Sequence, residues 1–251
     1  MNLSQMQDIG GCRIVLPSNE HVNAAIASMQ RHSTPWYEVS RMTDYREVGR
    51  TDTGYRAVHV LVRRDGCLLE VQLRTERQHG WAEAVERAAA RTNYRLKDGD
   101  GPDDLVSFFK LAGDLLARLD RGKRPTASML NDFRARDRAI QHYFPDMPPS
   151  DSPNFGLREA RRPSARENNW LLVYDWRQGT QYRWMDCGPD CIEAARTYAK
   201  WEREFPWRDG YEVVLIGSDS RETIEWTHAH YFGRSADDID PHGVLEELRA
   251  A

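Results

Sequence analysis

The sequence predicts an α+β protein with a smaller α/β module in its last third. Two apolar-alternating stretches, 57–62 and 67–73, flank a charged turn with a glycine and are typical of a β-hairpin. Apolar residues at helical spacing follow over 105–119. A second series of strand and helix patterns begins at residue 170, after a proline-rich stretch. With 251 residues, the chain can form one large domain or two of ordinary size.

The first part of the chain is expected to alternate short strands with helices. Residues 14–16 have the pattern of a short buried strand that ends at Pro17. After Thr75 the apolar period changes, which predicts a helix through 81–90. The remaining elements expected here are a helix at 22–30, a strand at 36–39 and helices at 105–119 and 131–143.

The last third is expected to have a β-β-α-β-α order. The predicted elements are strands at 170–176 and 182–185, a helix at 190–204, a strand at 211–217 and a helix at 220–228. This order is typical of a small α/β or α+β module. The sequence contains no internal repeat and no glycine pattern of the Walker or Rossmann type.

Charge and cysteine content exclude some classes of protein. The net charge is −4, from 35 Lys and Arg against 39 Asp and Glu, so it does not indicate nucleic-acid binding. The basic run from 118 to 166 fits either a solvated helical face or a phosphate-rich partner. No long apolar run or leader pattern occurs, so we expect no membrane span and no signal peptide. Four cysteines do not form a disulfide framework in a chain of this size, which favours a cytoplasmic protein.

Glu70 is the least expected residue of the hairpin, because its neighbours in the strand are leucines and a valine. Side chains two apart on a strand share a face, so Glu70 and Gln72 should point the same way. A carboxylate in this setting is costly unless its face is hydrated or it binds a cation. We therefore expect a functional role for Glu70.

Asp8 precedes one predicted strand and Glu70 lies inside another. If these strands are neighbours, the two carboxylates converge at one end of a sheet. That arrangement suits Mg²⁺, which is usually held by one or two carboxylates together with substrate phosphates. The sequence therefore makes Asp8 and Glu70 candidate ligands of Mg²⁺.

Other residues of this part suit a nucleotide. Arg13, His59 and Arg74 can donate to polyphosphate oxygens, and the ring of Tyr55 offers a flat face for a base. With a metal and a carboxylate that accepts a proton, these residues predict phosphoryl transfer. Each also fits an ordinary role: Asp8 as a turn residue, His59 as a hydrogen-bonded strand histidine and Tyr55 as a hairpin-edge aromatic.

Four blocks, in their order and spacing, resemble the synthetase domain of the RelA/SpoT family: DIGGCRIV, DYREVGRTDTGYRAVHV, LEVQLRT and HGWAE. The resemblance covers roughly residues 1–120. It implies a nucleotidyltransferase-like mixed sheet flanked by helices. It also implies Mg²⁺-dependent transfer of pyrophosphate from ATP to the 3′-hydroxyl of GDP or GTP, which makes the alarmones ppGpp and pppGpp.

The resemblance implies a role for each matching residue. Asp8 would bind Mg²⁺. Glu70 would be the metal-linked general base for the ribose hydroxyl, with Gln72 beside it. The adenine of ATP would stack on Arg13. Guanine would stack on Tyr55, and His59 would lie near the 5′-phosphates of the acceptor.

Two features depart from the family pattern. Family members carry an arginine- and lysine-rich segment that grips ATP upstream of the first block, and we expect further material before residue 1. The loop before the Gly-Tyr turn has Thr51 and Thr53 where the family has a lysine and an asparagine, so Arg50 is the nearest cation to the acceptor.

These departures leave three functions open. The first is alarmone synthesis. The second is a toxin-type pyrophosphokinase acting on tRNA or adenine nucleotides, as some small family members do, and the basic helices would suit tRNA. The third is a non-catalytic nucleotide-binding remnant. No HD-type hydrolase block is present, so alarmone breakdown is not expected, and the oligomeric state, a homo-oligomer included, stays open.

The expected domains are a RelA/SpoT-like domain at 1–122, a basic helix and proline-rich linker at 123–166, an accessory domain at 167–235 and an acidic tail at 236–251. In the accessory domain, Cys187, Cys191, His228 and His230 have the chemistry to bind Zn²⁺. Small core thiols and a hydrogen-bonded histidine pair are the more ordinary explanation of the same residues.

Overall fold

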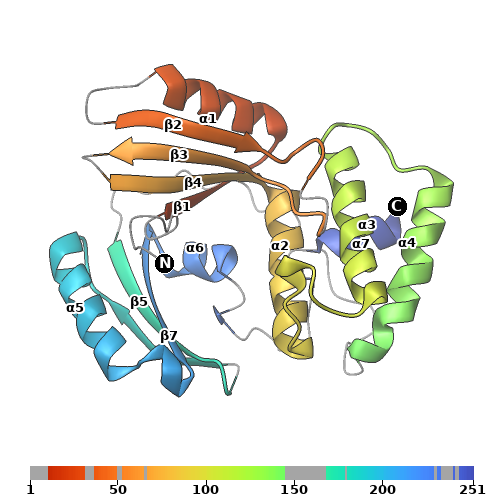
Figure 1. Cartoon of the computed structure of the whole chain (residues 1–251). Helices are drawn as coiled ribbons and strands as arrows, with labels where there is room; N and C mark the ends of the chain where they lie inside the picture. Colours follow the sequence, from red (N-terminus) through yellow and green to blue (C-terminus); the bar gives the residue numbers. More distant parts are fainter. Residues whose placement is uncertain are drawn as a thin grey trace. The chain divides into compact units, whose positions relative to one another are not determined.

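The computed structural model describes residues 11–31, 37–49, 53–64, 67–144, 168–178, 180–228, 231–232, 240 and 243–251. The chain divides into two compact units. Unit 1 comprises residues 1–154 and 239–251, and unit 2 comprises residues 155–238. Each unit has its own sheet (Figure 1). In the sequence, unit 2 is therefore inserted between two parts of unit 1.

Unit 1 contains a mixed four-stranded sheet in the order β1-β4-β3-β2. Its strands are β1 (Gly11–Leu16), β2 (Tyr37–Asp44), β3 (Val58–Arg64) and β4 (Cys67–Thr75). β1 runs parallel to β4, and the other pairs are antiparallel. The predicted strand at 36–39 was too short, because β2 pairs with β3 as far as Asp44.

One face of this sheet is covered by α1 (Asn19–Arg31). Val22 of α1 is buried among five apolar side chains of β3 and β4, namely Val58, Val60, Val62, Val71 and Leu73. The alternation of β3 and β4 therefore sends its valines and leucines to one side. The polar residues of β4 are left for the other face.

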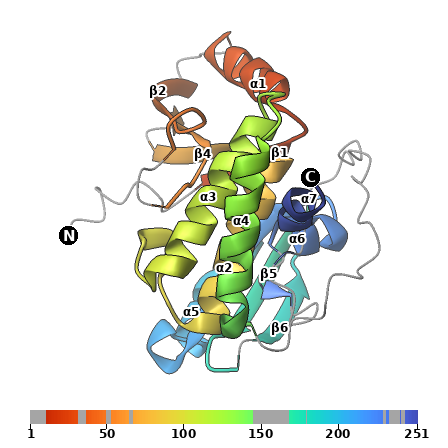
Figure 2. The same cartoon turned by 90° about the vertical axis from the view of Figure 1, so that its right-hand side faces the viewer.

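Three helices of unit 1, α2 (Glu76–Thr92), α3 (Asp103–Leu119) and α4 (Ala127–Ile140), pack side by side (Figure 2). Their apolar faces form a core around Phe108 and Phe133. Short 3₁₀ turns, η2 (Leu96–Asp98) and η3 (Gln141–Tyr143), follow α2 and α4. The predicted helices all form, each shifted by a few residues at its ends.

The expected acidic tail contains α7 (Val244–Ala250), whose Leu245 and Leu248 are fully buried in the core of unit 1. Asp240 accepts hydrogen bonds from three backbone N–H groups at the start of this helix. Arg249 forms a two-pronged ion pair with Asp137 of α4 at 3.0 and 2.7 Å. These contacts make the end of the chain part of a folded unit.

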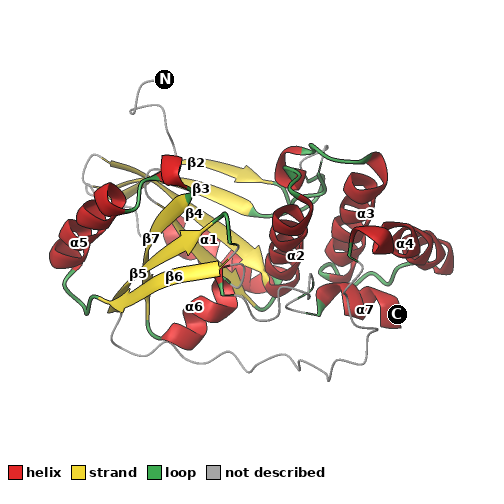
Figure 3. Ribbon diagram, turned by 90° about the horizontal axis from the view of Figure 1, so that it is seen from below, coloured by secondary structure: helices red, strands yellow, loops and turns green. Residues whose placement is uncertain are grey.

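Unit 2 confirms the β-β-α-β-α order. Its antiparallel sheet has the order β6-β5-β7, from β5 (Asn168–Asp175), β6 (Thr180–Asp186) and β7 (Tyr211–Ser218). Helices α5 (Cys191–Glu204) and α6 (Arg221–Thr227) lie on its two faces, and η4 (Trp207–Asp209) precedes β7 (Figure 3). Across both units, none of the helices that the structure describes is long and apolar enough to cross a membrane.

Candidate functional site

A row of polar side chains lies on the face of β4 opposite α1. Glu70, Gln72 and Arg74 alternate with buried Val71 and Leu73. The register of the neighbouring strands adds to this row. His59 of β3 and Arg13 of β1 both lie opposite Gln72. Residues far apart in the sequence are thus brought onto one patch of the sheet.

Glu70, His59, Tyr55 and Arg74 form a continuous chain of polar contacts. The Glu70 carboxylate lies 3.0 Å from His59 Nδ1, and the Tyr55 hydroxyl lies 2.6 Å from His59 Nε2. Arg74 donates to the same hydroxyl at 3.1 Å. The pattern is satisfied when His59 Nδ1 carries the proton and donates to Glu70, and Tyr55 donates to Nε2.

The carboxylate of Glu70 is about one quarter exposed (27%) and has the His59 ring as its partner. The Glu70 carboxylate is therefore partly hydrated, and His59 adds a hydrogen bond to it, so its presence in this strand is tolerated. Gly11 of β1 faces the backbone of Glu70, where an added Cβ would lie 2.9 Å from the Glu70 carbonyl oxygen. β1 can approach β4 this closely because residue 11 has no side chain.

Arg74 is a buried cation, and some of its N–H donors form no hydrogen bond with the described residues. Its side chain is 4% exposed, and its guanidinium lies 5.1 Å from the centre of the Tyr55 ring. Its Nε and Nη1 atoms are buried without a hydrogen-bond acceptor among the residues that the structure describes. Buried donors of this kind are unfavourable unless an anion completes them.

Arg13 brings a second cation to the same face. Its Nε donates to the Gln72 side-chain oxygen at 3.2 Å, and its Nη1 lies 3.5 Å from the buried Glu83 carboxylate. Burial lowers the pKa of the Arg13 guanidinium, and the charge of Arg74 lowers it further. Two partly desolvated guanidinium groups next to each other favour an anionic ligand.

Residues 1–98 match the family model described as the region found in RelA / SpoT proteins. The N-terminal part of the chain is a RelA/SpoT region. No curated protein matches the chain. The assignment rests on the family match, which covers every residue of the polar row.

Two solved structures of small alarmone synthetase 1 from Bacillus subtilis are similar to the chain at 20% identity. One, bound to its product pppGpp, has a TM-score of 0.41 and covers 54% of this chain and 68% of that chain. The other has a TM-score of 0.39 and covers 54% and 67%.

The polar row also has neighbours to which the sequence assigned no role. Glu83 of α2 is fully buried and contacts Arg13, and the rings of Tyr45 and Trp81 lie edge-on to Tyr55. A signal for Glu83 was present, since it is an acid in the otherwise apolar segment from Trp81 to Val85. A buried carboxylate needs a cation, but the sequence does not say which arginine supplies it.

Gly54 sets the position of Tyr55 in the RelA/SpoT region. It has φ +78°, and an added Cβ would lie 2.8 Å from Cα of Lys110 in α3. The Gly-Tyr turn can therefore pack directly against α3, which a larger residue would prevent. Trp81 of α2 donates to the Phe109 carbonyl at 2.8 Å and holds the two helices together beside this turn.

Several predicted site residues lie outside the described residues: Asp8, Arg50 and Thr51. The pairing of Asp8 with Glu70 at a shared metal ion therefore stays a prediction. Within the described part of the chain, no cluster of three or more Asp, Glu, His or Cys side chains is close enough to hold a metal. Glu70 alone supplies one carboxylate, which fits a Mg²⁺ ion that takes its other ligands from Asp8, water and substrate phosphates.

The zinc prediction for unit 2 also stays untested, because His230 lies outside the described residues. Cys191 is exposed at the first position of α5, and Cys187 is half-buried against the apolar cluster around Trp201. His228 lies parallel to the ring of Tyr231, with 6.4 Å between the ring centres.

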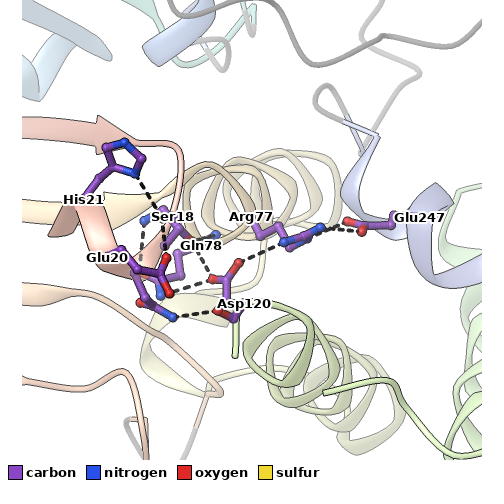
Figure 4. A network of polar contacts seen from close by, with 9 residues as sticks. Ser18, Glu20, His21, Arg77, Gln78, Asp120 and Glu247 are labelled. Carbon is purple, nitrogen blue, oxygen red and sulfur yellow. Dashed lines mark hydrogen bonds and ion pairs between the residues drawn. The ribbon is translucent and has the colours of Figure 1, made fainter. Parts of the chain in front are cut away.

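A second polar network, at the start of α2, fixes the end of β4 (Figure 4). Asp120 accepts hydrogen bonds from Thr75 and from Arg77, the latter at 3.2 Å. Arg77 also binds Glu247 of α7 through two hydrogen bonds of 2.8 Å. Because Thr75 directly follows Arg74, this network holds the strand end from which Arg74 enters the site.

Proposed function

We propose that the RelA/SpoT region transfers a pyrophosphate group from ATP to the 3′-hydroxyl of GDP or GTP, and so makes guanosine alarmones. The observation that carries the proposal is the polar row of β4. A partly exposed carboxylate lies there beside a histidine, and two guanidinium groups, the buried one of Arg74 and the partly buried one of Arg13, lie further along the same face. The family match supports the same chemistry. General-base catalysis and binding of polyphosphate need this combination.

In the proposed reaction, Glu70 accepts the proton of the ribose 3′-hydroxyl. A bond forms between that oxygen and the β-phosphorus of ATP, and the bond from the β-phosphorus to the bridging oxygen of the α-phosphate breaks, so that AMP leaves. His59 donates to Glu70 and fixes the direction of the carboxylate. Mg²⁺, held by Glu70 and the expected ligand Asp8, would neutralise phosphate charge when bound.

Arg13 and Arg74 bind phosphate oxygens in this proposal. Anionic oxygens would satisfy the buried Nε and Nη1 donors of Arg74 and reduce the repulsion between the two cations. The guanidinium of Arg74 lies over one face of Tyr55. A guanine that stacks on this face displaces Arg74, and phosphates are the natural new partners of the displaced cation. Base stacking and phosphate binding are then coupled.

Two arginines of the basic run, Arg134 and Arg136, give no independent support to a tRNA acceptor. Arg136 of α4 pairs with Asp132 one turn away, and Arg134 donates to the backbone carbonyl of Arg249. These arginines are engaged within unit 1. An assay with each candidate acceptor of the pyrophosphate group therefore distinguishes guanine nucleotides from tRNA.

The test uses ATP labelled in its γ-phosphate, Mg²⁺ and one acceptor at a time: GDP, GTP, ADP or deacylated tRNA. The protein is made from the longest reading frame that contains this chain. Label transferred to GDP or GTP supports the proposal. Transfer to ADP or tRNA assigns the toxin-type activity instead. Guanine-nucleotide binding in calorimetry without transfer to any acceptor would identify a non-catalytic remnant.

A further inference from the structure

Unit 2 has a shallow depression of about 560 Å³ outside the RelA/SpoT region. It lies where the turn after β5 meets η4 and the start of β7. Its lining residues are Trp176, Arg177, Trp207, Arg208, Asp209 and Gly210. None of them takes part in the proposed transfer reaction.

Two indole rings form a corner of this depression. Trp176 is 43% exposed and Trp207 is 68% exposed. Their ring centres are 6.3 Å apart and their planes are inclined by 71°. A flat ring stacked on one indole would therefore meet the other at its edge, a favourable arrangement of aromatic groups. Neighbouring exposed tryptophans are typical of a binding surface.

The corner is held in place by contacts within unit 2. The backbone N–H of Trp176 donates to the Gly210 carbonyl at 2.9 Å. The side chain of Arg177 lies against Gly210, where an added Cβ would be 2.9 Å from it, and its guanidinium lies 4.8 Å from the centre of the Tyr211 ring. The buried carboxylate of Asp175 accepts a hydrogen bond from Arg177 Nε at 3.3 Å. The walls are thus ordered without a ligand.

The charges of the depression select the ligand. Asp175 compensates Arg177, whereas Arg208 and Asp209 are exposed and form no ion pair with another described residue. A simple cation would be repelled by Arg208, and a simple anion would leave the indoles uncovered. A nucleotide offers a flat ring for an indole, N–H donors for Asp209 and a phosphate for Arg208.

We propose that this depression binds a nucleotide unit, with the base stacked in the Trp176–Trp207 corner and the phosphate at Arg208. The unit is either a free ribonucleotide or one nucleotide of a single-stranded RNA, since both present the same chemistry. The site is separate from the proposed transfer reaction and does not depend on it.

The test titrates the full chain with GMP, AMP, UMP, a short single-stranded RNA and tripolyphosphate, followed by tryptophan fluorescence and calorimetry. We expect saturable binding that Trp207→Ala and Arg208→Ala each weaken about tenfold or more. Ile192→Ala and Arg203→Ala are matched controls, because both residues are exposed on α5 outside the depression. All titrations are repeated in an Arg13→Ala and in a Tyr55→Ala background, which weaken the binding of adenine and guanine nucleotides at the polar row of β4.

Binding of the mononucleotides identifies a free nucleotide as the ligand, and binding of the RNA without the mononucleotides identifies RNA. Three results would overturn the proposal: no saturable binding of any probe, equal binding of tripolyphosphate, or unchanged binding by Trp207→Ala. The readout is binding rather than pyrophosphate transfer. Failure of this proposal is therefore distinct from failure of the proposed function.

Discussion

The central strands of the two sheets, β4 in unit 1 and β5 in unit 2, use their second face in opposite ways. β4 buries Val71 and Leu73 on one face and presents Glu70, Gln72 and Arg74 on the other. β5 is buried on both faces over four consecutive residues, Leu171, Leu172, Val173 and Tyr174. Leu172 packs into the cluster with α6, and Leu171 packs into the cluster with α5.

The comparison shows where each unit can place chemistry. A strand sealed on both faces stabilises its unit but leaves no room for a ligand on the sheet, so the polar groups of unit 2 gather beyond the end of β5, at Arg177 and Arg208. A strand with one polar face is less stabilising and offers converging side chains at fixed spacing. Six substitutions test this difference.

Glu70→Gln should have the largest effect. It keeps the shape of the side chain and removes the proton acceptor, so we expect pyrophosphate transfer to fall by about 100-fold or more. The free energy of unfolding should change little, because the carboxylate is partly exposed. The measurements are the labelled-ATP assay and denaturant unfolding of the same preparation.

Glu38→Gln is the matched control for that change, because Glu38 is exposed on β2 of the same sheet. It should leave transfer unchanged. If Glu70→Gln retained the wild-type rate, Glu70 would not be the base. The proposed role of the polar face of β4 in pyrophosphate transfer would then be wrong.

Leu172→Ala in β5 should have the largest effect on stability. Removing a fully buried leucine side chain costs about 2–5 kcal/mol. Gln72→Ala in β4 removes a partly exposed hydrogen-bond acceptor of Arg13 and should cost about 1 kcal/mol. Denaturant unfolding of the two variants compares the central strands directly. Equal losses would contradict the distinction between a structural and a functional strand, and Ile192→Ala serves as an exposed control.

The local pattern of the sequence predicted much of this difference. Alternation in 67–73 placed Glu70 and Gln72 on one face, and the apolar run within 170–176 predicted a strand. The order of elements in unit 2 also followed from local periods and turns. These features depend on neighbours within a few residues, so the sequence displays them directly.

Contacts between distant residues were not predictable in the same way. The parallel pairing of β1 with β4 was a condition of the site prediction, and the contact of Glu83 with Arg13 was not foreseen. The segment of α7 was predicted only as part of an acidic tail, from its charge, and its seven residues are too few for a stable isolated helix. Its stability comes from Asp137 and Arg77, which lie more than 100 positions away in the sequence.

Arg74→Met should separate function from stability. The change removes a buried cation with two unsatisfied donors and keeps most of the side-chain volume, so stability should be unchanged or rise by about 1 kcal/mol. Transfer should fall by about 100-fold, because phosphate loses a positive partner. Arg63→Met, at an exposed position of β3, is the control. A large loss of stability in Arg74→Met would make Arg74 a structural residue.

The smallest expected effects are on how stability changes with pH. The contribution of one aspartate in each unit should change in opposite directions as the pH rises. Burial raises the pKa of Asp120 in unit 1, although hydrogen bonds from Thr75 and Arg77 act against it. The hydrogen bond from Arg177 lowers the pKa of Asp175 in unit 2 below its ordinary 3.8. Native Asp120 therefore holds its proton more tightly than the unfolded chain, and its contribution to stability falls as the pH rises from about 3.8 through the raised pKa.

Native Asp175 holds its proton less tightly than the unfolded chain, so its contribution is present above pH 3.8 and is lost as the pH falls through the lowered pKa. Asp120→Asn should remove the loss of stability of unit 1 that accompanies rising pH. Asp175→Asn should remove the loss of stability of unit 2 that accompanies falling pH. Hydrogen exchange of the α2 and β5 amides between pH 3 and 7 reports the two units separately. If both substitutions shifted the pH profile in the same direction, burial would not dominate at Asp120, and the Arg77 pair would instead set the charge state at the end of β4.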